Sequence, residues 1–410
     1  MEYIEYNSLI AQRHPSHWRV VRNKSFLSLV GEKVGNRANE YTLLSLTTNG
    51  VIVRDVESGK GKFPKDFDTY QVVKPRELVF CLFDIDETPR TVGLVDTEGM
   101  VTGAYSAFRV DERFALPNFV YLYYLAVDNN KALKPYYSGL RKTVRADKFL
   151  QIYLPLPPLP EQEKIVNYIE SRTSKIDAYI NCLKVELDLY KELIESIIYS
   201  KELKDCVIFS SWENFFDNSW RTELGRGLFE EIEIKGVSTE RFLAVTQDKG
   251  LIYKDVEGVN FVTAEKKETQ KLVCPGEFVI SLRSFEGGIE YSTIKGLISP
   301  AYVVLRLKGK YNTKRHQMYF RFLLKSVPFI SRLNSISDSM RDGKSIKFSD
   351  IRRFPFPIPP EEKLDEIYKL SAIYDIKKEA YEKKRLLLDE YKQRLIADCV
   401  TGQVNVQNET

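Results

Sequence analysis

Apolar and polar positions follow the same order twice along the chain. Each half begins with short β-branched and aromatic runs bounded by Gly, Asn, Asp or Pro, such as "YTLLSL" and "ELVFCLF" in the first half and "EFVISLR" and "AYVVLRL" in the second. This composition is typical of strands. A helical segment follows in each half, "NFVYLYYLAVDN" and "RHQMYFRFLLKSV". Each half therefore predicts an α+β domain of about 150 residues with its strands first.

Two longer segments then change to apolar steps of four and three residues, the spacing of a coiled-coil seam. The first seam consists of Ile176, Ile180, Leu183, Leu187, Tyr190, Ile194 and Ile197. The second is less regular, because Lys377 and Lys384 interrupt it, and consists of Ile367, Leu370, Tyr374, Tyr381, Leu388, Tyr391 and Leu395. Each seam predicts one helix roughly 55 to 60 Å long at 1.5 Å per residue. Neither helix can bury its stripe alone, so we expect the two to pack antiparallel as a coiled-coil rod.

Prolines separate each α+β domain from the helix that follows it. The two junctions are "LPLPPLPEQEKIV" at 154–166 and "FPFPIPPEEKLDEI" at 354–367. Consecutive prolines end the extended segment, and the acidic residues after them suit the positive end of a new helix. The alternative, that "PLPPLP" is a polyproline ligand for an aromatic groove, leaves its recurrence at the second boundary unexplained.

Alignment of the two junctions predicts an internal repeat with pseudo-twofold symmetry. Pro155 falls on Pro355 and Glu161 on Glu361, an offset of 200 (355−155 and 361−161). The same offset places "NGVIVRD" on "KGLIYKD" and "VVKPRELVF" on "LVCPGEFVI", while Arg109 matches Arg306 after a small shift and Trp18 matches Trp220. The predicted domains are 1–153, a junction and helix at 154–205, a second α+β domain at 206–353, and a junction, helix and tail at 354–410.

Composition narrows the class of protein. A net charge of +4 over 410 residues is mild, so any nucleic-acid-binding surface must be local. The start "MEYIEYNSLI" has no basic and apolar leader pattern, and no apolar run approaches 18 residues, so we expect a soluble cytoplasmic protein without a membrane segment. The five cysteines have no CxxC spacing, which indicates buried reduced thiols rather than a metal site.

The sequence offers no recognisable catalytic centre. It has no GxxxxGK[ST] phosphate loop, no HExxH and no GxSxG elbow. The three histidines His14, His17 and His316 leave little for acid–base chemistry. Two Glu-x-Lys elements, at 264–267 and 361–363, lack an upstream Asp partner for a nuclease site. We therefore expect a non-catalytic chain with neither metal nor cofactor.

Three segments carry a resemblance to a known family. They are "SGLRKTVRADKFLQIYLPLPPLPEQEKIVNYIE" at 138–170, "MRDGKSIKFSDIRRFPFPIPPEEKLDEI" at 340–367 and the tail "LIADCVTGQVNV" at 395–406. With its duplicated architecture, the chain resembles the specificity subunit of type I restriction–modification enzymes over essentially its whole length. The second junction departs from the first, since Glu362 stands where the first has Gln162.

The resemblance implies a DNA-binding subunit of a methyltransferase and restriction complex. Each α+β domain would be a target recognition domain reading one half of an asymmetric bipartite site in double-stranded DNA. The helices would set the spacer and dock two methyltransferase subunits, and a separation of roughly 40 to 60 Å corresponds to about 12 to 18 base pairs. Methylation of an adenine and ATP-driven cleavage would belong to other chains. The resemblance leaves open whether restriction subunits join the complex.

Candidate DNA contacts are basic residues on or beside loop-like segments, because cations hold phosphates and donors read bases. In the first half they are Arg54, Lys60, Lys62, Arg90, Arg141, Lys142 and Arg145. In the second half they are Lys249, Lys254, Lys266, Lys267, Arg283, Arg341, Lys344 and Lys347. The clusters "GLRKTVR" and "MRDGKSIK" recur beside both junctions.

Two other functions stay open from the residues alone. A coiled-coil interaction scaffold with two α+β binding domains would show no salt-sensitive DNA affinity, whereas a DNA-binding protein loses affinity steeply as salt rises. An enzyme with an unrecognised active site would show turnover as purified protein.

Overall fold

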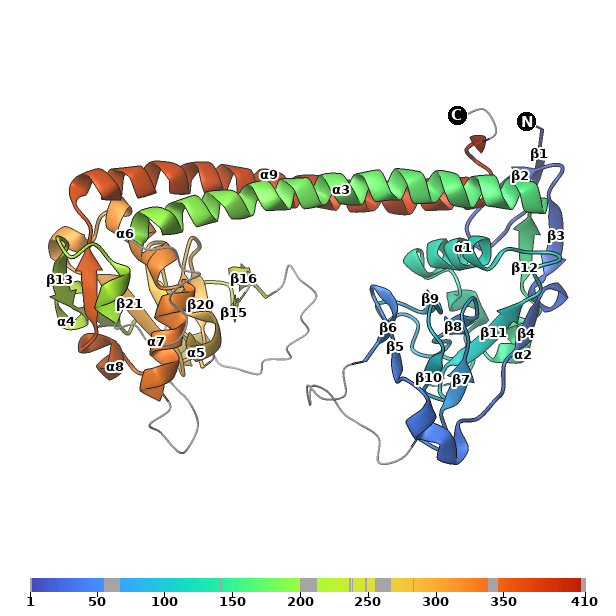
Figure 1. The fold of residues 1–410 in the computed structure, drawn as a ribbon, viewed down its shortest axis with the longest axis horizontal. Coiled ribbons are helices and arrows are strands. Elements are labelled where there is room, and N and C mark those ends of the chain that lie inside the picture. The colour runs from blue at the N-terminus through green and yellow to red at the C-terminus, as the bar shows by residue number, and fades with distance from the viewer. Residues whose placement is uncertain are drawn as a thin grey trace. The chain divides into compact units, whose positions relative to one another are not determined.

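The computed structural model describes residues 2–54, 67–139, 142–199, 212–235, 237, 239–247, 249–254, 267–282, 284–337 and 346–406. Their contacts divide the chain into unit 1, with residues 1–181 and 383–410, and unit 2, with residues 182–382. Both boundaries lie inside the two long helices, α3 (Leu159–Ile198) and α9 (Glu361–Val400). Each long helix therefore contributes one part to each unit (Figure 1). The domain limits predicted at the prolines stay a prediction about recognition domains.

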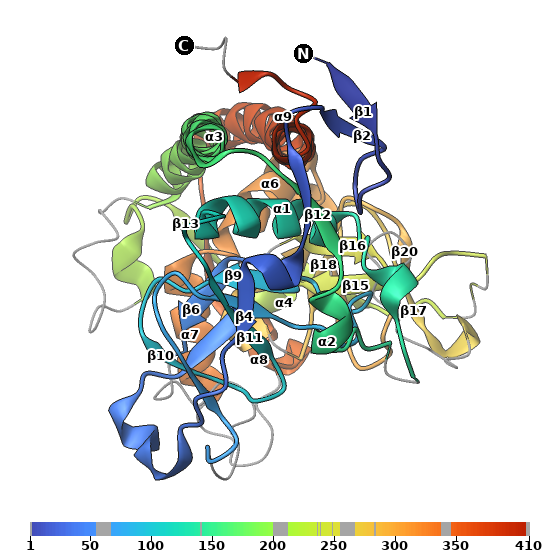
Figure 2. The same cartoon turned by 90° about the vertical axis from the view of Figure 1, so that its right-hand side faces the viewer.

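Unit 1 is an α+β assembly around a four-stranded antiparallel sheet of order β4-β11-β8-β9. Its strands are β1 (Tyr3–Glu5), β2 (Arg13–Pro15), β3 (Arg19–Arg22), β4 (Leu27–Leu29), β5 (Leu44–Thr47), β6 (Gly50–Val53), β7 (Gln71–Val73), β8 (Leu78–Phe80), β9 (Val92–Leu94), β10 (Gly99–Val101), β11 (Ser106–Val110) and β12 (Tyr153–Leu156). Helix α1 (Pro117–Asn129) lies beside the long helices, and α2 (Ala146–Phe149) precedes β12 (Figure 2).

Unit 2 repeats this plan with a four-stranded antiparallel sheet of order β14-β21-β18-β19. Its strands are β13 (Arg221–Leu224), β14 (Phe229–Ile232), β15 (Leu243–Thr246), β16 (Gly250–Tyr253), β17 (Lys271–Val273), β18 (Phe278–Ile280), β19 (Glu290–Tyr291), β20 (Gly296–Ile298), β21 (Val303–Leu307) and β22 (Pro355–Ile358). Its short helices are α4 (Gly225–Leu228), α5 (Ser284–Gly287), α6 (Lys314–Leu323), α7 (Val327–Ser337) and α8 (Phe348–Arg352).

The structure confirms the α+β class and the internal repeat. Strands β6, β7 and β8 correspond to β16, β17 and β18 at the predicted offset of 200, and β11 corresponds to β21 at an offset of 197 (303−106). A side-chain ion pair is repeated as well. Arg109 Nη2 lies 2.7 Å from Glu77 Oε1, and Arg306 Nη2 lies 2.5 Å from Glu277 Oε1.

The predicted register of the proline junctions is wrong by two residues. Leu156 of β12 pairs with Arg19, and Ile358 of β22 pairs with Arg221, so the offset is 202 on both strands (358−156 and 221−19). The long helices agree, since α3 begins at residue 159 and α9 at residue 361. Trp18 and Trp220, which directly precede the first strand of each pair, correspond as predicted. Glu161 therefore corresponds to Lys363 rather than to Glu361.

Each unit has its own aromatic core. In unit 1, Phe80, Phe108, Tyr124 and Phe149 pack together, with ring centroids 4.8 to 5.7 Å apart. The C-terminal part of α9 also belongs to this core through Leu395, Ile396, Cys399 and Val400. In unit 2, Phe229, Phe320, Phe354 and Phe356 take part in the corresponding core, to which Ile194 of α3 and Ile367 of α9 also belong. Burial of these rings ties each long helix to both sheets.

The long helices pack antiparallel along the predicted seams. In unit 1, Lys392 pairs with Asp177, and Lys384 lies 5.9 Å from the ring centroid of Tyr179. In unit 2, Leu187 and Ile194 are buried and the other α3 seam residues are half-buried.

The second seam differs from its prediction at three positions. Lys377, expected to interrupt it, instead faces α3, where it pairs with Glu186 and lies 5.1 Å from the Tyr190 ring centroid. Lys384 also reaches α3, where its Nζ donates to the Tyr179 hydroxyl at 3.4 Å, although it stays exposed. Tyr391 is 53% exposed and does not belong to the seam, because Lys392 takes the inward position between Leu388 and Leu395.

Candidate nucleic-acid interface

The same hairpin turn occurs in both units. Thr47 Oγ1 at the end of β5 donates to the Gly50 carbonyl at 3.0 Å, and Thr246 Oγ1 at the end of β15 donates to the Gly250 carbonyl at 3.0 Å. Both glycines have positive φ, 94° and 71°, a conformation that costs glycine little. The two sequences therefore build one hairpin shape, β5–β6 and β15–β16, at equivalent places in the two units.

A basic residue directly follows the second strand of each hairpin. The backbone N–H of Arg54 donates to the Leu43 carbonyl at 2.9 Å, and that of Lys254 donates to the Phe242 carbonyl at 3.1 Å. Arg54 and Lys254 were both predicted to contact DNA. Their equivalence gives each unit a cation at the base of its hairpin.

Unit 2 gathers several cations around two aromatic rings of this hairpin, which we call the hairpin cluster (Arg241, Phe242, Tyr253, Lys254 and Lys267). The Nζ atoms of Lys254 and Lys267 each lie 5.7 Å from the Phe242 ring centroid, and the Arg241 guanidinium lies 3.9 Å from that of Tyr253. The structure thus brings together two predicted residues, Lys254 and Lys267. Sequence reasoning missed Arg241, whose only signal was its position just before an apolar strand.

A second pair of equivalent cations precedes the short helices α2 and α8. Arg145 and Lys347 each occupy the N-cap position, 202 residues apart (347−145). The Arg145 side chain is 72% exposed and lies 3.3 Å from Asp147, and Lys347 is also exposed. Both predicted residues are presented to solvent at one structural position, which suits contact with a phosphate backbone.

Lys142 lies beside acidic side chains that offset its positive charge. Its Nζ lies 3.5 Å from Asp86 and 4.0 Å from Glu87, and Lys134 Nζ lies 3.2 Å from Asp86. Tyr137 donates to the same carboxylate at 2.9 Å, and burial together with this bond raises the pKa of Tyr137 to about 12. Lys142 therefore offers less net charge than Arg145.

Arg90 is held inside unit 1. Its guanidinium donates to Asp128 at 3.2 Å and to Asn129 at 3.0 Å, and its side chain is only 20% exposed. Asp128 also accepts from the Thr91 backbone and from Lys131. These bonds fasten α1 to the segment before β9, so Arg90 is committed to the structure of unit 1.

The remaining predicted residues divide into two groups. Lys249 is exposed at the β15–β16 turn. Seven others lie outside the described residues: Lys60, Lys62, Arg141, Lys266, Arg283, Arg341 and Lys344. Within the described ranges there is no group of three or more His, Cys, Asp or Glu side chains that could hold a metal ion. No helix in the same ranges is long and apolar enough to cross a membrane.

Comparison with known proteins gives one family and one shared fold. Residues 103–186 match the family described as the type I restriction modification DNA specificity domain. One solved structure, from work on complex assembly and conformational transition of the type I R-M system, matches with a TM-score of 0.53 and 15% identity, over 95% of this chain and 99% of that one. The HsdS subunit from Thermoanaerobacter tengcongensis matches with a TM-score of 0.40 and 15% identity, over 95% and 98%. The S subunit from M. genitalium matches with a TM-score of 0.45 and 13% identity, over 96% and 99%.

Proposed function

We propose that the chain is a specificity subunit of a type I restriction–modification enzyme and that each of its α+β units reads one half of an asymmetric bipartite DNA site. The observation that carries this proposal is the recurrence of cations at matched positions, Arg54 with Lys254 and Arg145 with Lys347, on a duplicated fold. The sequences around these positions differ between the units, so the two half-sites should differ. As a specificity subunit, the chain is a non-catalytic component of its complex.

The proposed DNA-binding surface combines positioning and reading. Exposed cations such as Arg145, Lys347 and Lys249 suit phosphate contacts, which orient the protein without reading sequence. The hairpin cluster supplies guanidinium and ammonium donors held beside aromatic rings, a combination suited to base edges in the major groove. The predicted basic residues outside the described ranges stay candidates for the same surface.

The long helices serve two proposed purposes, setting the spacer between half-sites and docking methyltransferase subunits. In unit 2, α3 exposes Val185, Leu189 and Leu193, spaced four residues apart and each about half exposed. In unit 1, α9 exposes Leu386 and Leu387 in the same way. Exposed apolar stripes on paired helices are typical of protein-docking surfaces. The internal repeat favours two methyltransferase copies, one for each unit.

The test is a map of methylated adenines in the genome of cells with the gene intact and with it deleted. We expect one asymmetric motif, with two short parts around a fixed gap, to disappear on deletion. An unchanged map, together with no salt-sensitive DNA affinity of the purified chain, would favour the interaction scaffold instead.

Charge reversal tests the cationic positions directly. Arg145→Glu should weaken binding to a duplex carrying the motif by about tenfold and lower the salt dependence of log Kd by about one, as expected for one lost phosphate contact. Arg394→Glu is the matched control, because Arg394 is also a highly exposed arginine, placed on α9 and paired with an aspartate as Arg145 is. Equal effects of the two variants would argue against a specific contact at Arg145.

A further inference from the structure

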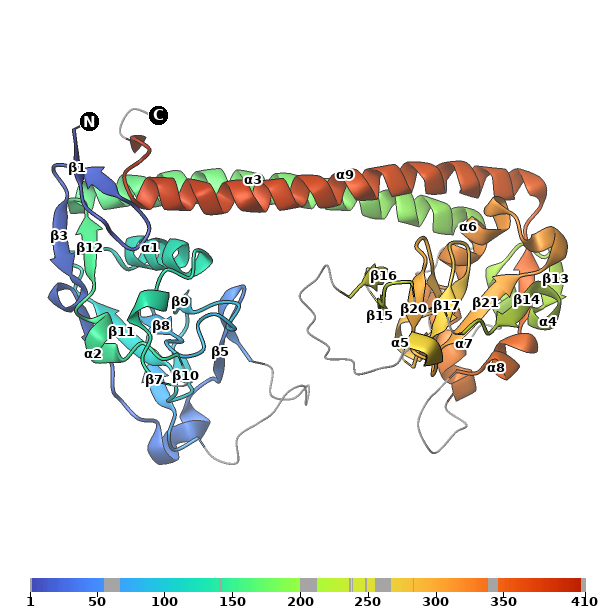
Figure 3. The same ribbon diagram turned by 180° about the vertical axis from the view of Figure 1, so that it is seen from behind.

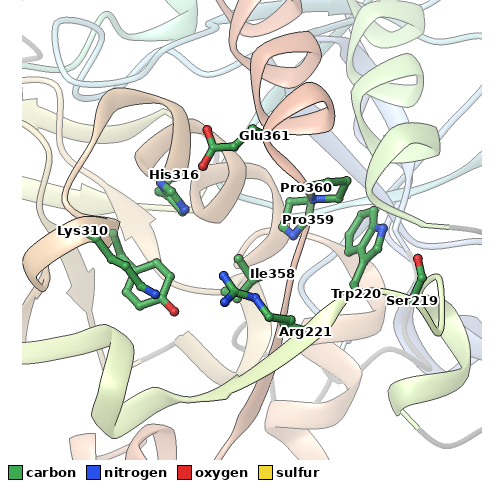
Figure 4. A pocket seen from close by; sticks show the side chains of 10 residues that line it. Ser219, Trp220, Arg221, Lys310, His316, Ile358, Pro359, Pro360 and Glu361 are labelled. Carbon is green, nitrogen blue, oxygen red and sulfur yellow. The ribbon is translucent and has the colours of Figure 1, made fainter.

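A cavity of about 300 Å³ opens in unit 2 where α9 begins. Its walls include Trp220, Arg221, Lys310, His316 and the Pro359–Glu361 turn (Figure 4). The proposed DNA-binding surface does not use this cavity. The cavity is large enough for one side chain of another molecule.

The charges around the cavity favour an anion. Arg221 and Lys310 are exposed cations, and neither has an ion-pair partner among the residues that the structure describes. The carboxylate of Glu361 also lines the cavity, and Arg315 Nη1, which lies 2.8 Å from it and 3.0 Å from Asp365, offsets part of its charge. The first turn of α9, a helix of 40 residues, adds the partial positive charge of a helix N-terminus.

His316, a mostly buried residue, lines this cavity. The residue is only 7% exposed. Its Nδ1 lies 2.8 Å from Thr313 Oγ1, which itself accepts the His316 backbone N–H. The Thr313 hydroxyl hydrogen is thus available to Nδ1, which leaves the ring proton on Nε2. In the described part of the chain Nε2 has no hydrogen-bond partner, and it is not among the fully buried polar atoms, so it reaches the open space of the cavity. The cavity therefore presents a donor that lacks an acceptor.

The equivalent place in unit 1 is closed by the chain itself. Trp18 corresponds to Trp220, and Phe119 corresponds to His316 at the offset of 197 that relates β11 to β21 (316−119). Trp18 packs edge-on against Phe119, with ring centroids 6.5 Å apart. The buried Glu161 carboxylate accepts from Trp18 Nε1 at 3.1 Å and lies 2.8 Å from His17 Nε2.

Unit 2 has a lysine where unit 1 has this buried carboxylate. The residue that corresponds to Glu161 is Lys363, which is exposed and pairs with Glu366 at 3.0 Å. No acceptor for the Trp220 indole N–H occurs within the described ranges. Unit 1 thus fills the place with the buried Glu161 carboxylate, whereas unit 2 leaves a cavity bordered by two cations, by the His316 donor and by Glu361, which pairs with Arg315.

We propose that this cavity receives an acidic side chain of the methyltransferase subunit, whose carboxylate is held by Arg221, Lys310 and His316 Nε2. The inference rests on the proposed function, in which the long helices dock that subunit. The cavity lies at the first turn of α9, at the edge of unit 2 away from the β15–β16 hairpin (Figures 1 and 3). A protein side chain therefore suits it better than a DNA phosphate.

The test measures the Kd between the full chain and the purified methyltransferase subunit with which it methylates DNA. Lys310→Glu should weaken association at least about tenfold, the usual effect of losing a charge-assisted hydrogen bond. His316→Phe installs the residue that closes the place in unit 1, so it should weaken association similarly while raising the melting temperature. Lys314→Glu is the matched control, an exposed lysine on the same helix that does not line the cavity, and should leave Kd within about twofold.

The outcomes separate this inference from the proposed function. Normal association of both Lys310→Glu and His316→Phe would refute the inference alone. Weakened binding of Lys310→Glu to DNA with unchanged methyltransferase association would also refute it, in favour of a phosphate site. Failure of the unchanged chain to associate with the methyltransferase subunit would refute the proposed docking function and this inference with it. Recovery of Lys310→Glu binding by an acid-to-Lys change in the methyltransferase subunit would identify the occupant.

Discussion

Replacement of Gln162 by leucine should destabilise unit 1 selectively. Gln162 is fully buried in the first turn of α3. Its Oε1 accepts from the Leu116 backbone N–H at 2.8 Å, and its Nε2 donates to the carbonyls of Phe114 at 3.1 Å and Pro157 at 2.8 Å. One side chain thereby joins the long helix to the proline junction and to the start of α1. Leucine, which unit 2 has at the corresponding Leu364, fits the volume but makes none of these bonds.

The expected magnitude follows from the three bonds. Each contributes about 1 kcal/mol net, and the orphaned Leu116 N–H adds to the loss, while burial of the leucine side chain offsets part of it. We expect the free energy of unfolding of unit 1 to fall by about 2 to 4 kcal/mol. Gln393→Leu is the control, because Gln393 is exposed on α9 and its replacement should change stability by less than about 0.5 kcal/mol.

The assay measures tryptophan fluorescence, because the three tryptophans are divided between the two units. Trp18 lies in unit 1, whereas Trp212 and Trp220 lie in unit 2. In a background with phenylalanine at positions 212 and 220, the fluorescence of the buried Trp18 during urea unfolding reports unit 1 alone. A loss below about 0.5 kcal/mol for Gln162→Leu, equal to that of the control, would refute the argument that these bonds fasten the junction.

Three further changes have expected outcomes. Gly402→Val should lower the melting temperature of unit 1, since Gly402 has φ 72° and an added Cβ would lie 2.5 Å from Pro15 Cδ; Trp18 fluorescence would measure it. Arg321→Ala should cost unit 2 about 2 to 3 kcal/mol in urea unfolding, because it removes a two-bond pair with Asp375. Burial raises the pKa of Glu195, so its contribution to stability is lost as pH rises through that pKa. The stability that Glu195→Gln gains over the unchanged chain should therefore be larger at pH 7 than at pH 5. A gain that calorimetry finds to be the same at both pH values would contradict this.

The architecture could be predicted because the periodicity of apolar residues and the internal sequence repeat are robust signals. The strand runs, the two seams and the offset of 200 at β6, β7 and β8 each depend on several residues, so local divergence does not hide them. The junction register failed for a physical reason. Extended chains alternate with a period of two, so a shift of two residues keeps every side chain on the same face. The pairing of Leu156 with Arg19 and of Ile358 with Arg221, together with the starts of α3 and α9, distinguishes the two alignments.

The candidate interface was less predictable, because it depends on contacts between distant residues. Lys254 and Lys267 both lie near Phe242 only because the hairpin folds. Arg90 has the sequence context of a surface cation, and its bond to Asp128 becomes evident only in the folded structure. The seam failed at Tyr391 for a related reason. A lysine can occupy an inward position when an acidic residue faces it, as Asp177 faces Lys392, so charge alone does not place a residue outside.

The two junctions share one backbone plan but differ in a coordinated set of side chains. A buried polar network is stable only when all of its members are paired. Exchange of one member alone would leave the others orphaned, which explains why the differences occur together: Phe119, Glu161 and Gln162 in unit 1 correspond to His316, Lys363 and Leu364 in unit 2. A repeated fold therefore does not give repeated binding energies. If methyltransferase subunits dock at both junctions, the open cationic cavity occurs, among the residues that the structure describes, in unit 2 alone, so the two copies should bind with unequal affinities.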